Sequence, residues 1–197
     1  MSKIRLTIGI SGASGAAIAV EILKTLAAMD QVETHLVVSR GAEETIRQEV
    51  SLSLEEVLSL ADVVHDNQNI GAAIASGSFK AAGMIVAPCS MKTLAGIASG
   101  YSDTLLLRAA DVTLKESRRL VLVARECPLS AVHLRNMLEL ARLGAVILPP
   151  VLTYYNHPAT IDDMTRHIAA KCLDLFNIEH PGFRRWGHEP GPGMPKA

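Results

Sequence analysis

Gly9-Ile10-Ser11-Gly12-Ala13-Ser14-Gly15 joins an apolar run to a segment with helical spacing. The run over residues 3–10 (KIRLTIGI) has the β-branched and apolar character of a buried strand. Residues 15–29 (GAAIAVEILKTLAAM) carry apolar side chains at the spacing of a helix. Small residues in the turn leave backbone N–H groups open at the helix N-terminus, where an anion, most often a phosphate, binds. The stretch therefore predicts a strand–turn–helix unit with an anion site.

The glycine spacing narrows the choice of ligand. It is G-x-x-G-x-x-G, which differs from the G-x-G-x-x-G of dinucleotide sites and lacks the Lys-Ser/Thr pair of a Walker loop. A mononucleotide is the ligand that fits this pattern. The alternative is a tight strand–helix turn that binds nothing.

Strand-like and helix-like segments alternate along the rest of the chain. Further strands are predicted at 32–38 (VETHLVV), 83–88 (GMIVAP), 120–125 (LVLVAR) and 145–148 (AVIL). Helices are predicted at 40–49, 53–61, 90–99, 104–116, 130–143 and 161–176. This alternation predicts an α/β domain with a doubly wound, flavodoxin- or Rossmann-like parallel sheet and helices on both faces. We expect one domain over residues 1–189 and a flexible tail over 190–197.

Composition excludes several classes of protein. With 197 residues, 49% of them hydrophobic, the chain is long enough for one domain with a full core. A net charge of −1 argues against nucleic-acid binding, and no apolar stretch is long enough to span a membrane. The chain enters a strand at once, which predicts no signal peptide, and its three cysteines show no CxxC pair, which favours the cytoplasm. A mean hydropathy of +0.25 predicts apolar contacts between subunits.

Polar side chains follow each predicted strand at its carboxyl end, where doubly wound sheets bind ligands. They are Ser11 and Ser14, Ser39, residues 88–93 (PCSMKT), Arg125 with Glu126, and Tyr154 with Tyr155. Each serine taken alone is more simply a helix cap. The whole set favours a nucleotide pocket at this edge.

Eight stretches in chain order resemble the UbiX-type flavin prenyltransferases, and together they extend over nearly the whole chain. They are GISGASG (9–15), ASGS (75–78), PCSMKT (88–93), RAADVTLKE (108–116), RECPL (125–129), AVILPP (145–150), YNHP (155–158) and RWG (185–187). The resemblance implies a flavin-binding domain that assembles as a homododecamer with FMN between subunits. It also implies transfer of a dimethylallyl group from dimethylallyl monophosphate to N5 and C6 of reduced FMN. The prenylated FMN would serve a UbiD-type aromatic acid decarboxylase.

The resemblance also implies roles for particular residues. FMN would be bound by Gly12, Ala13, Ser14, Ser39, Ser90, Met91, Lys92, Thr93 and Arg125. The prenyl phosphate would be held by Lys115, Arg125, Tyr155 and Lys171, and the catalytic residues would be Glu126, Glu49, Ser14 and Lys115. Many relatives have arginine at the position of Lys171, and lysine keeps the charge but not the bidentate geometry. Trp186 would shield the allylic cation, or else fill a subunit contact.

The residues fit a prenyl transfer without a metal ion. The Asp162-Asp163 pair is followed by Arg166 where a D-D-x-x-D motif for Mg²⁺ needs a third aspartate. Cations must then neutralise the phosphate, and those available are Arg108, Lys115, Arg125 and Lys171. Ring closure at C6 must release a proton, so Glu126, Glu49 or the departing phosphate must act as the base.

Two other functions are alternatives to the prenyl transfer. A cysteine-decarboxylase type of flavoenzyme needs an Asn in a P-x-M-N-type motif and a His on an early helix; PCSMKT has no Asn, and residues 15–29 have no His. The second is an FMN-binding subunit or carrier of a hydroxybenzoate or phenylacrylic acid decarboxylase, for which the extra cations have little use. We expect Cys89 and Cys127 to be packing residues or to line the pocket, and His35 and His133 to be structural. Both the monophosphate and the diphosphate remain possible prenyl donors.

Overall fold

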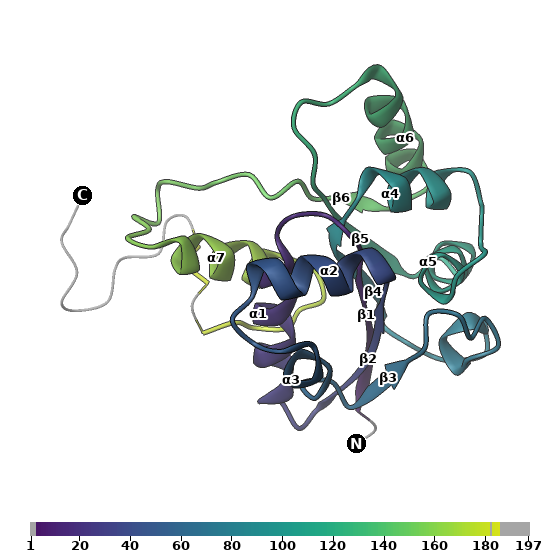
Figure 1. Ribbon diagram of the computed structural model, residues 1–197, viewed down its shortest axis with the longest axis horizontal. Helices are drawn as coiled ribbons and strands as arrows, with labels where there is room; N and C mark the ends of the chain where they lie inside the picture. Colours follow the sequence, from purple (N-terminus) through teal and green to yellow (C-terminus); the bar gives the residue numbers. More distant parts are fainter. Residues whose placement is uncertain (1–2, 182, 186–197) are drawn as a thin grey trace.

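The computed structural model describes residues 3–181 and 183–185, and a parallel sheet forms its centre (Figure 1). The strands are β1 (Ile4–Ile10), β2 (Val32–Val38), β3 (Val63–His65), β4 (Gly83–Cys89), β5 (Arg119–Ala124) and β6 (Val146–Ile147). They lie in the order β3-β2-β1-β4-β5-β6, and every neighbouring pair is parallel.

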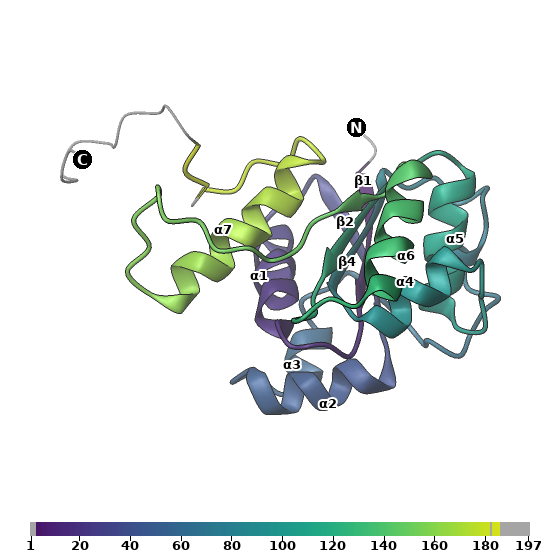
Figure 2. The same ribbon diagram turned by 90° about the horizontal axis from the view of Figure 1, so that it is seen from above.

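Helices cover both faces of the sheet (Figures 1 and 2). One face carries α1 (Ala16–Ala27), α2 (Arg40–Glu49), α3 (Leu54–Leu58) and α7 (Ile161–Asp174). The other carries the short 3-10 helix η1 (Ala73–Ala75), α4 (Met91–Ala98), α5 (Leu105–Lys115) and α6 (Ala131–Arg142). A separate buried cluster lies on each side of the sheet, which is why β4 is buried along its whole length.

Side chains of the central strands alternate between these two clusters. In β4, Ile85 and Ala87 pack with α1 and α7, while Met84 and Val86 pack with α4 and α5. The period of two residues follows from the strand geometry. Each large aliphatic side chain buried in this way contributes roughly 1.5–3 kcal/mol.

The direction of strand addition reverses between β1 and β4. The chain builds outward from β1 to β2 and β3, then returns to place β4 on the other side of β1 and continues to β5 and β6. The two halves therefore diverge at the carboxyl ends of β1 and β4, and such a switch point forms a crevice where ligands bind. The 9–15 stretch lies at this point, since Gly9 of β1 is in register with Val86 of β4.

The predicted doubly wound fold is confirmed, with small differences in its elements. The strand β3 and the 3-10 helix were not predicted, because each has only three residues and no clear periodicity. Helix α3 ends at Leu58, before the predicted residue 61, and β6 has two residues of the predicted four. The single domain over 1–189 and the flexible tail over 190–197 stay predictions, because residues 186–197 lie outside the described part. Within that part, no helix combines the length and apolar character needed to cross a membrane.

Candidate functional site

The loops after β1 and β4 are joined by the buried Ser11. Its backbone N–H and its hydroxyl donate to the Pro88 carbonyl, at 3.2 and 2.9 Å, and its Oγ accepts the Ser90 N–H at 2.8 Å. Ser11 therefore fixes the two sides of the crevice relative to each other. Its hydroxyl is occupied by these structural contacts.

Three helices begin side by side at this edge, because α1, α2 and α4 follow the adjacent strands β1, β2 and β4. Ser39 caps α2 by accepting the Ala42 N–H at 3.2 Å, and Ser90 caps α4 by accepting the Thr93 N–H at 3.2 Å. The caps expected of single serines are thus present. The positive ends of the helix dipoles nevertheless converge here, so the edge as a whole favours an anion.

Gly12 allows the turn after β1 to lie against the start of α2. A Cβ atom at Gly12 would stand 2.9 Å from both the Cα and the carbonyl carbon of Gly41. Real Cβ contacts of that length with backbone are essentially absent. Any side chain at Gly12 would push the turn away from α2 and change the shape of the edge.

The anion at the N-terminus of α1 is the carboxylate of Glu49. Its Oε2 accepts the N–H groups of Gly15 and Ala16 at 2.8 and 3.1 Å. Burial works against ionisation of Glu49, but hydrogen bonds from Ser14, Gly15 and Ala16 and the charge of Arg125 outweigh it, so the pKa is lowered. The site predicted for a phosphate thus has an occupant from the chain itself. A carboxylate with a lowered pKa is also a weaker base.

Arg125 and Glu126 follow β5 and are exposed at the same edge. The Arg125 N–H donates to the Cys89 carbonyl at 3.0 Å, which ties the segment to the end of β4. Glu126 Oε1 accepts the Cys127 N–H at 3.0 Å. The structure therefore brings Glu49, Ser14 and Arg125 together and leaves the Glu126 carboxylate open to solvent.

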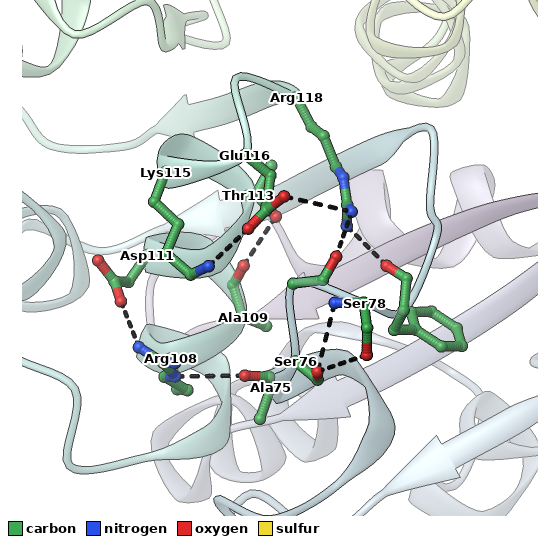
Figure 3. A network of polar contacts seen from close by, with 12 residues as sticks. Ala75, Ser76, Ser78, Arg108, Ala109, Asp111, Thr113, Lys115, Glu116 and Arg118 are labelled. Carbon is green, nitrogen blue, oxygen red and sulfur yellow. Dashed lines mark hydrogen bonds and ion pairs between the residues drawn. The ribbon is translucent and has the colours of Figure 1, made fainter.

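Lys115 lies at the opposite edge of the sheet from Arg125. It is the last residue of α5, directly before the amino end of β5, and its Nζ lies 2.6 Å from Glu116 Oε1. Helix α5 must run back across the sheet between parallel strands, so its last turn is at the amino-end edge. Figure 3 shows Lys115 against Glu116, in one polar network with Arg118 and the loop that carries Ser76 and Ser78.

Tyr155 and Lys171 form a third group around the buried His167. The rings of Tyr155 and His167 meet edge to face with centroids 5.9 Å apart, and Lys171 Nζ lies 3.2 Å from Asp174 Oδ2. Burial lowers the pKa of His167, and the nearby Lys171 charge lowers it further. The group belongs to α7 and the loop before it, on the face of the sheet that carries α1.

The aspartates that resembled part of a magnesium motif belong to the start of α7. Asp163 Oδ2 accepts the N–H groups of Ala159 and Thr160 at 3.0 and 2.9 Å, and its Oδ1 lies 2.6 Å from Arg166. The arginine and these hydrogen bonds strongly lower the pKa of Asp163. Among residues 3–181 and 183–185, no three His, Cys, Asp or Glu side chains are arranged to hold a metal ion.

The cysteines and histidines considered in the sequence have the following places. Cys89 is buried, and burial raises the pKa of its thiol to about 12, while Cys127 is exposed. His133 forms the capping box of α6 with Ser130, and the buried His35 lies 2.8 Å from Glu33 and 3.0 Å from His65. Both histidines thus have structural contacts. Trp186 lies outside the described residues.

The sequence analysis did not find the residues that hold the predicted ligand-binding side chains in place. Glu116 contacts Lys115, and His167 contacts Tyr155. Arg118 lies near Glu116. Of the three, only Glu116 was part of a quoted stretch, as the last residue of 108–116. Their partners are distant in sequence, so spacing alone does not reveal them.

The fold and its polar edge define a flavodoxin-like α/β protein with an anion-binding switch point. In agreement, the Flavoprotein family profile matches residues 1–173. The chain belongs to the UbiX family of flavin prenyltransferases. It is 54% identical over 182 residues to the "Flavin prenyltransferase UbiX" of Neisseria meningitidis serogroup B, which covers 92% of this chain and 96% of the relative.

Two solved structures have nearly the same fold. The crystal structure of AnUbiX in complex with FMN and dimethylallyl pyrophosphate has a TM-score of 0.92 at 49% identity, covering 95% of this chain and 100% of the other. A dodecameric FMN-dependent UbiX-like decarboxylase from Escherichia coli O157:H7 has a TM-score of 0.92 at 52% identity, covering 94% and 100%.

Proposed function

We propose that this chain is a flavin prenyltransferase that attaches a dimethylallyl group from dimethylallyl monophosphate to N5 and C6 of reduced FMN. The observation that carries the proposal is the close match, over 95% of the chain, to a solved relative that holds both FMN and a prenyl donor. The solved relative holds the pyrophosphate, so both donors belong in the test. Membership of the family supports the same reaction.

The residues at the carboxyl edge fit an FMN phosphate. The first N–H groups of α2 and α4 have no partner within their helices, and each serine cap satisfies only part of them. Because Glu49 takes the start of α1, we assign the phosphate to the starts of α2 and α4, at Ser39 and at 90–93. Gly12 to Ser14 and Arg125 would line the rest. Bound reduced FMN supplies the nucleophilic N5 and C6 atoms.

The predicted prenyl-phosphate residues support a site shared between copies of the chain. Arg125, Lys115 and the Tyr155–Lys171 group lie in three different places of one chain. A homo-oligomer, such as the dodecamer described for the Escherichia coli relative, would bring them together. Exposed apolar side chains suited to such contacts are Val132, Leu134 and Leu138 on α6 and Val151, Leu152, Tyr154 and Ile161 on and after the 148–160 loop. The cations would neutralise the leaving phosphate without a metal ion.

Glu126 is the base that we assign to the proton released at C6. Its carboxylate is exposed next to Arg125, at the edge where the flavin would lie. Glu49 is the weaker candidate, because its carboxylate is committed to the start of α1 and its pKa is lowered. We assign Glu49 to holding the Ser14 turn and facing Arg125.

The product would serve a UbiD-type decarboxylase. We place the protein in the cytoplasm because all three cysteines are free thiols.

A second candidate function is that of an FMN-binding subunit or carrier of an aromatic acid decarboxylase. It is favoured by the description of the Escherichia coli relative as an FMN-dependent decarboxylase. Both candidate functions need FMN to bind at the carboxyl-end edge of the sheet, the flavin edge, but only the prenyltransferase changes the flavin chemically.

The test is mass spectrometry of flavin extracted after anaerobic incubation of the protein with reduced FMN and either prenyl donor, in the presence of EDTA. We expect a flavin heavier by one C₅ unit. Glu126→Gln should lower the rate by about 10²–10⁴-fold, the usual contribution of a general base. Glu139→Gln, an exposed carboxylate on α6, is the matched control. Bound but unchanged FMN in the unmodified protein would favour the carrier instead.

A further inference from the structure

Arginine side chains hold the loop over residues 75–79 at the amino-end edge (Figure 3). Arg118 Nη1 donates to the Phe79 carbonyl at 2.6 Å and Nη2 to the Gly77 carbonyl at 2.7 Å. Arg108 Nε donates to the Ala75 carbonyl at 3.3 Å. Only 19% of the Arg118 side chain is exposed, so its two hydrogen bonds are largely shielded from water. The loop is thus fixed at three of its carbonyls.

This loop lies directly against Lys115. A Cβ atom added to Gly77 would come closest to Glu116 Oε1 and would stand 2.8 Å from both Glu116 Cδ and Lys115 Nζ. The ammonium and carboxylate of this pair are themselves 2.6 Å apart. The backbone at Gly77 therefore forms a wall against the Lys115–Glu116 pair, and a shift of the loop moves the space that the ammonium occupies.

Arg118 also acts on the other side of that pair. Its Nη2 lies 3.9 Å from Glu116 Oε2, while Lys115 lies at Oε1. One guanidinium therefore touches the two loop carbonyls and lies near the carboxylate that holds the lysine. The planar fork of arginine can reach all three, whereas a lysine has one nitrogen for the same task.

We propose that Arg118 is a positioning residue for the prenyl donor: it clamps the Gly77 and Phe79 carbonyls and thereby places the Lys115 ammonium that binds the donor phosphate. This inference rests on the proposed function, in which Lys115 has that role. Arg118 acts through the loop and through Glu116. Gly77 is the second part of the device, because a Cβ atom there would make the ends of the Glu116 and Lys115 side chains move.

Two variants test the clamp from different sides. Arg118→Lys keeps the charge but loses the paired hydrogen bonds, and Gly77→Ala displaces the Glu116–Lys115 pair while leaving Arg118 intact. Each should raise both the KM and the calorimetric Kd for dimethylallyl monophosphate on the order of tenfold, with the Kd for FMN unchanged. Arg142→Lys, a mostly exposed arginine on α6, is the matched control and should leave both constants unchanged.

Comparing the affinity for the prenyl donor with the affinity for FMN separates a positioning role from general support of the fold. Donor binding that stays at the unmodified value in both folded variants would overturn the inference, and so would an equal loss of FMN affinity. The melting temperature is measured on every variant, and Gly77→Ala decides the question if Arg118→Lys does not fold. If the unmodified protein makes no prenylated flavin, the proposed function fails. If the unmodified protein makes prenylated flavin and both variants bind the prenyl donor as tightly as it does, the positioning role of Arg118 is wrong but the proposed function stands.

Discussion

Glu49 shows how one side chain changes the meaning of a sequence motif. The small-residue turn predicts an anion at the start of α1, and the structure supplies it from the end of α2. Two backbone donors, the Ser14 hydroxyl and the Arg125 charge favour the ionised form over the cost of burial. Glu49 therefore belongs to the support of the turn, and this role has a measurable pH dependence.

Replacing Glu49 with glutamine should reduce the free energy of unfolding at pH 7 by about 1 kcal/mol, the usual size of a helix-cap contribution. The folded-state pKa of Glu49 is below that of an ordinary glutamate, so the stabilisation is present above the ordinary pKa and is lost as the pH falls through the folded-state pKa. The difference between the two proteins should therefore stay constant above the ordinary glutamate pKa and shrink at more acidic pH. Urea unfolding at several pH values measures it.

Glu44→Gln is the control for this prediction, because Glu44 makes only an exposed ion pair with Arg47 on the same helix. Exposed pairs of this kind contribute 0.5 kcal/mol or less. A difference between Glu49→Gln and the unmodified protein that does not depend on pH would show that the charge of Glu49 is not what stabilises the turn.

At the scale of elements, the flavin edge depends on how closely the β1–α1 turn approaches α2. The backbones of Gly12 and Gly41 are in direct contact, so the position of one element sets that of the other. Ser11 adds the link to β4. The caps at Ser39 and Ser90 then define where α2 and α4 begin.

Gly12→Ala should weaken FMN binding by more than about tenfold, because its Cβ would meet the backbone of Gly41 and separate the turn from α2. Fluorescence quenching on titration of FMN into the protein measures the affinity. Gly71→Ala is the matched control, since its Cβ would find its nearest neighbour at 3.5 Å, an ordinary contact. Equal FMN affinity in Gly12→Ala and Gly71→Ala would contradict the assignment of this turn to the flavin.

At the scale of the whole molecule, the predicted residues lie at both edges of one sheet. Arg125 follows the carboxyl end of β5, and Lys115 precedes its amino end. A strand of six residues separates these two positions within the chain, which is roughly 20 Å of extended backbone. One phosphate cannot contact both side chains from a single copy.

Mixed oligomers test this arrangement. Chains with Lys115→Ala and chains with Arg125→Ala should each be nearly inactive, and co-expression should restore part of the activity, because some sites would receive both intact residues from different copies. The yield of prenylated flavin per oligomer, with the oligomer mass measured by light scattering, gives the answer. Oligomers that contain both chains and remain as inactive as the single variants would place both residues in one copy.

Much of the fold follows from local pattern. Apolar runs bounded by glycine and serine predicted β1, β2, β4, β5 and β6, and helical spacing predicted α1 to α7, because burial on both faces imposes these patterns on the sequence. β3 was not predicted because its three residues are half-buried or exposed and show no clear pattern. The edge of the sheet with Ser39, Ser90 and Arg125 was predicted too, because parallel strands all end on one side.

The sequence by itself thus determined the doubly wound domain, its polar edge and the family to which it belongs. Only the tertiary structure decided that Glu49 meets the start of α1, that Lys115 lies at the far edge, and that Arg118 clamps the loop beside it. The physical reason is the distance along the sequence between the residues that interact. Strand and helix patterns come from neighbours along the chain, whereas these contacts join residues 34 to 41 positions apart or depend on the direction in which α5 crosses the sheet.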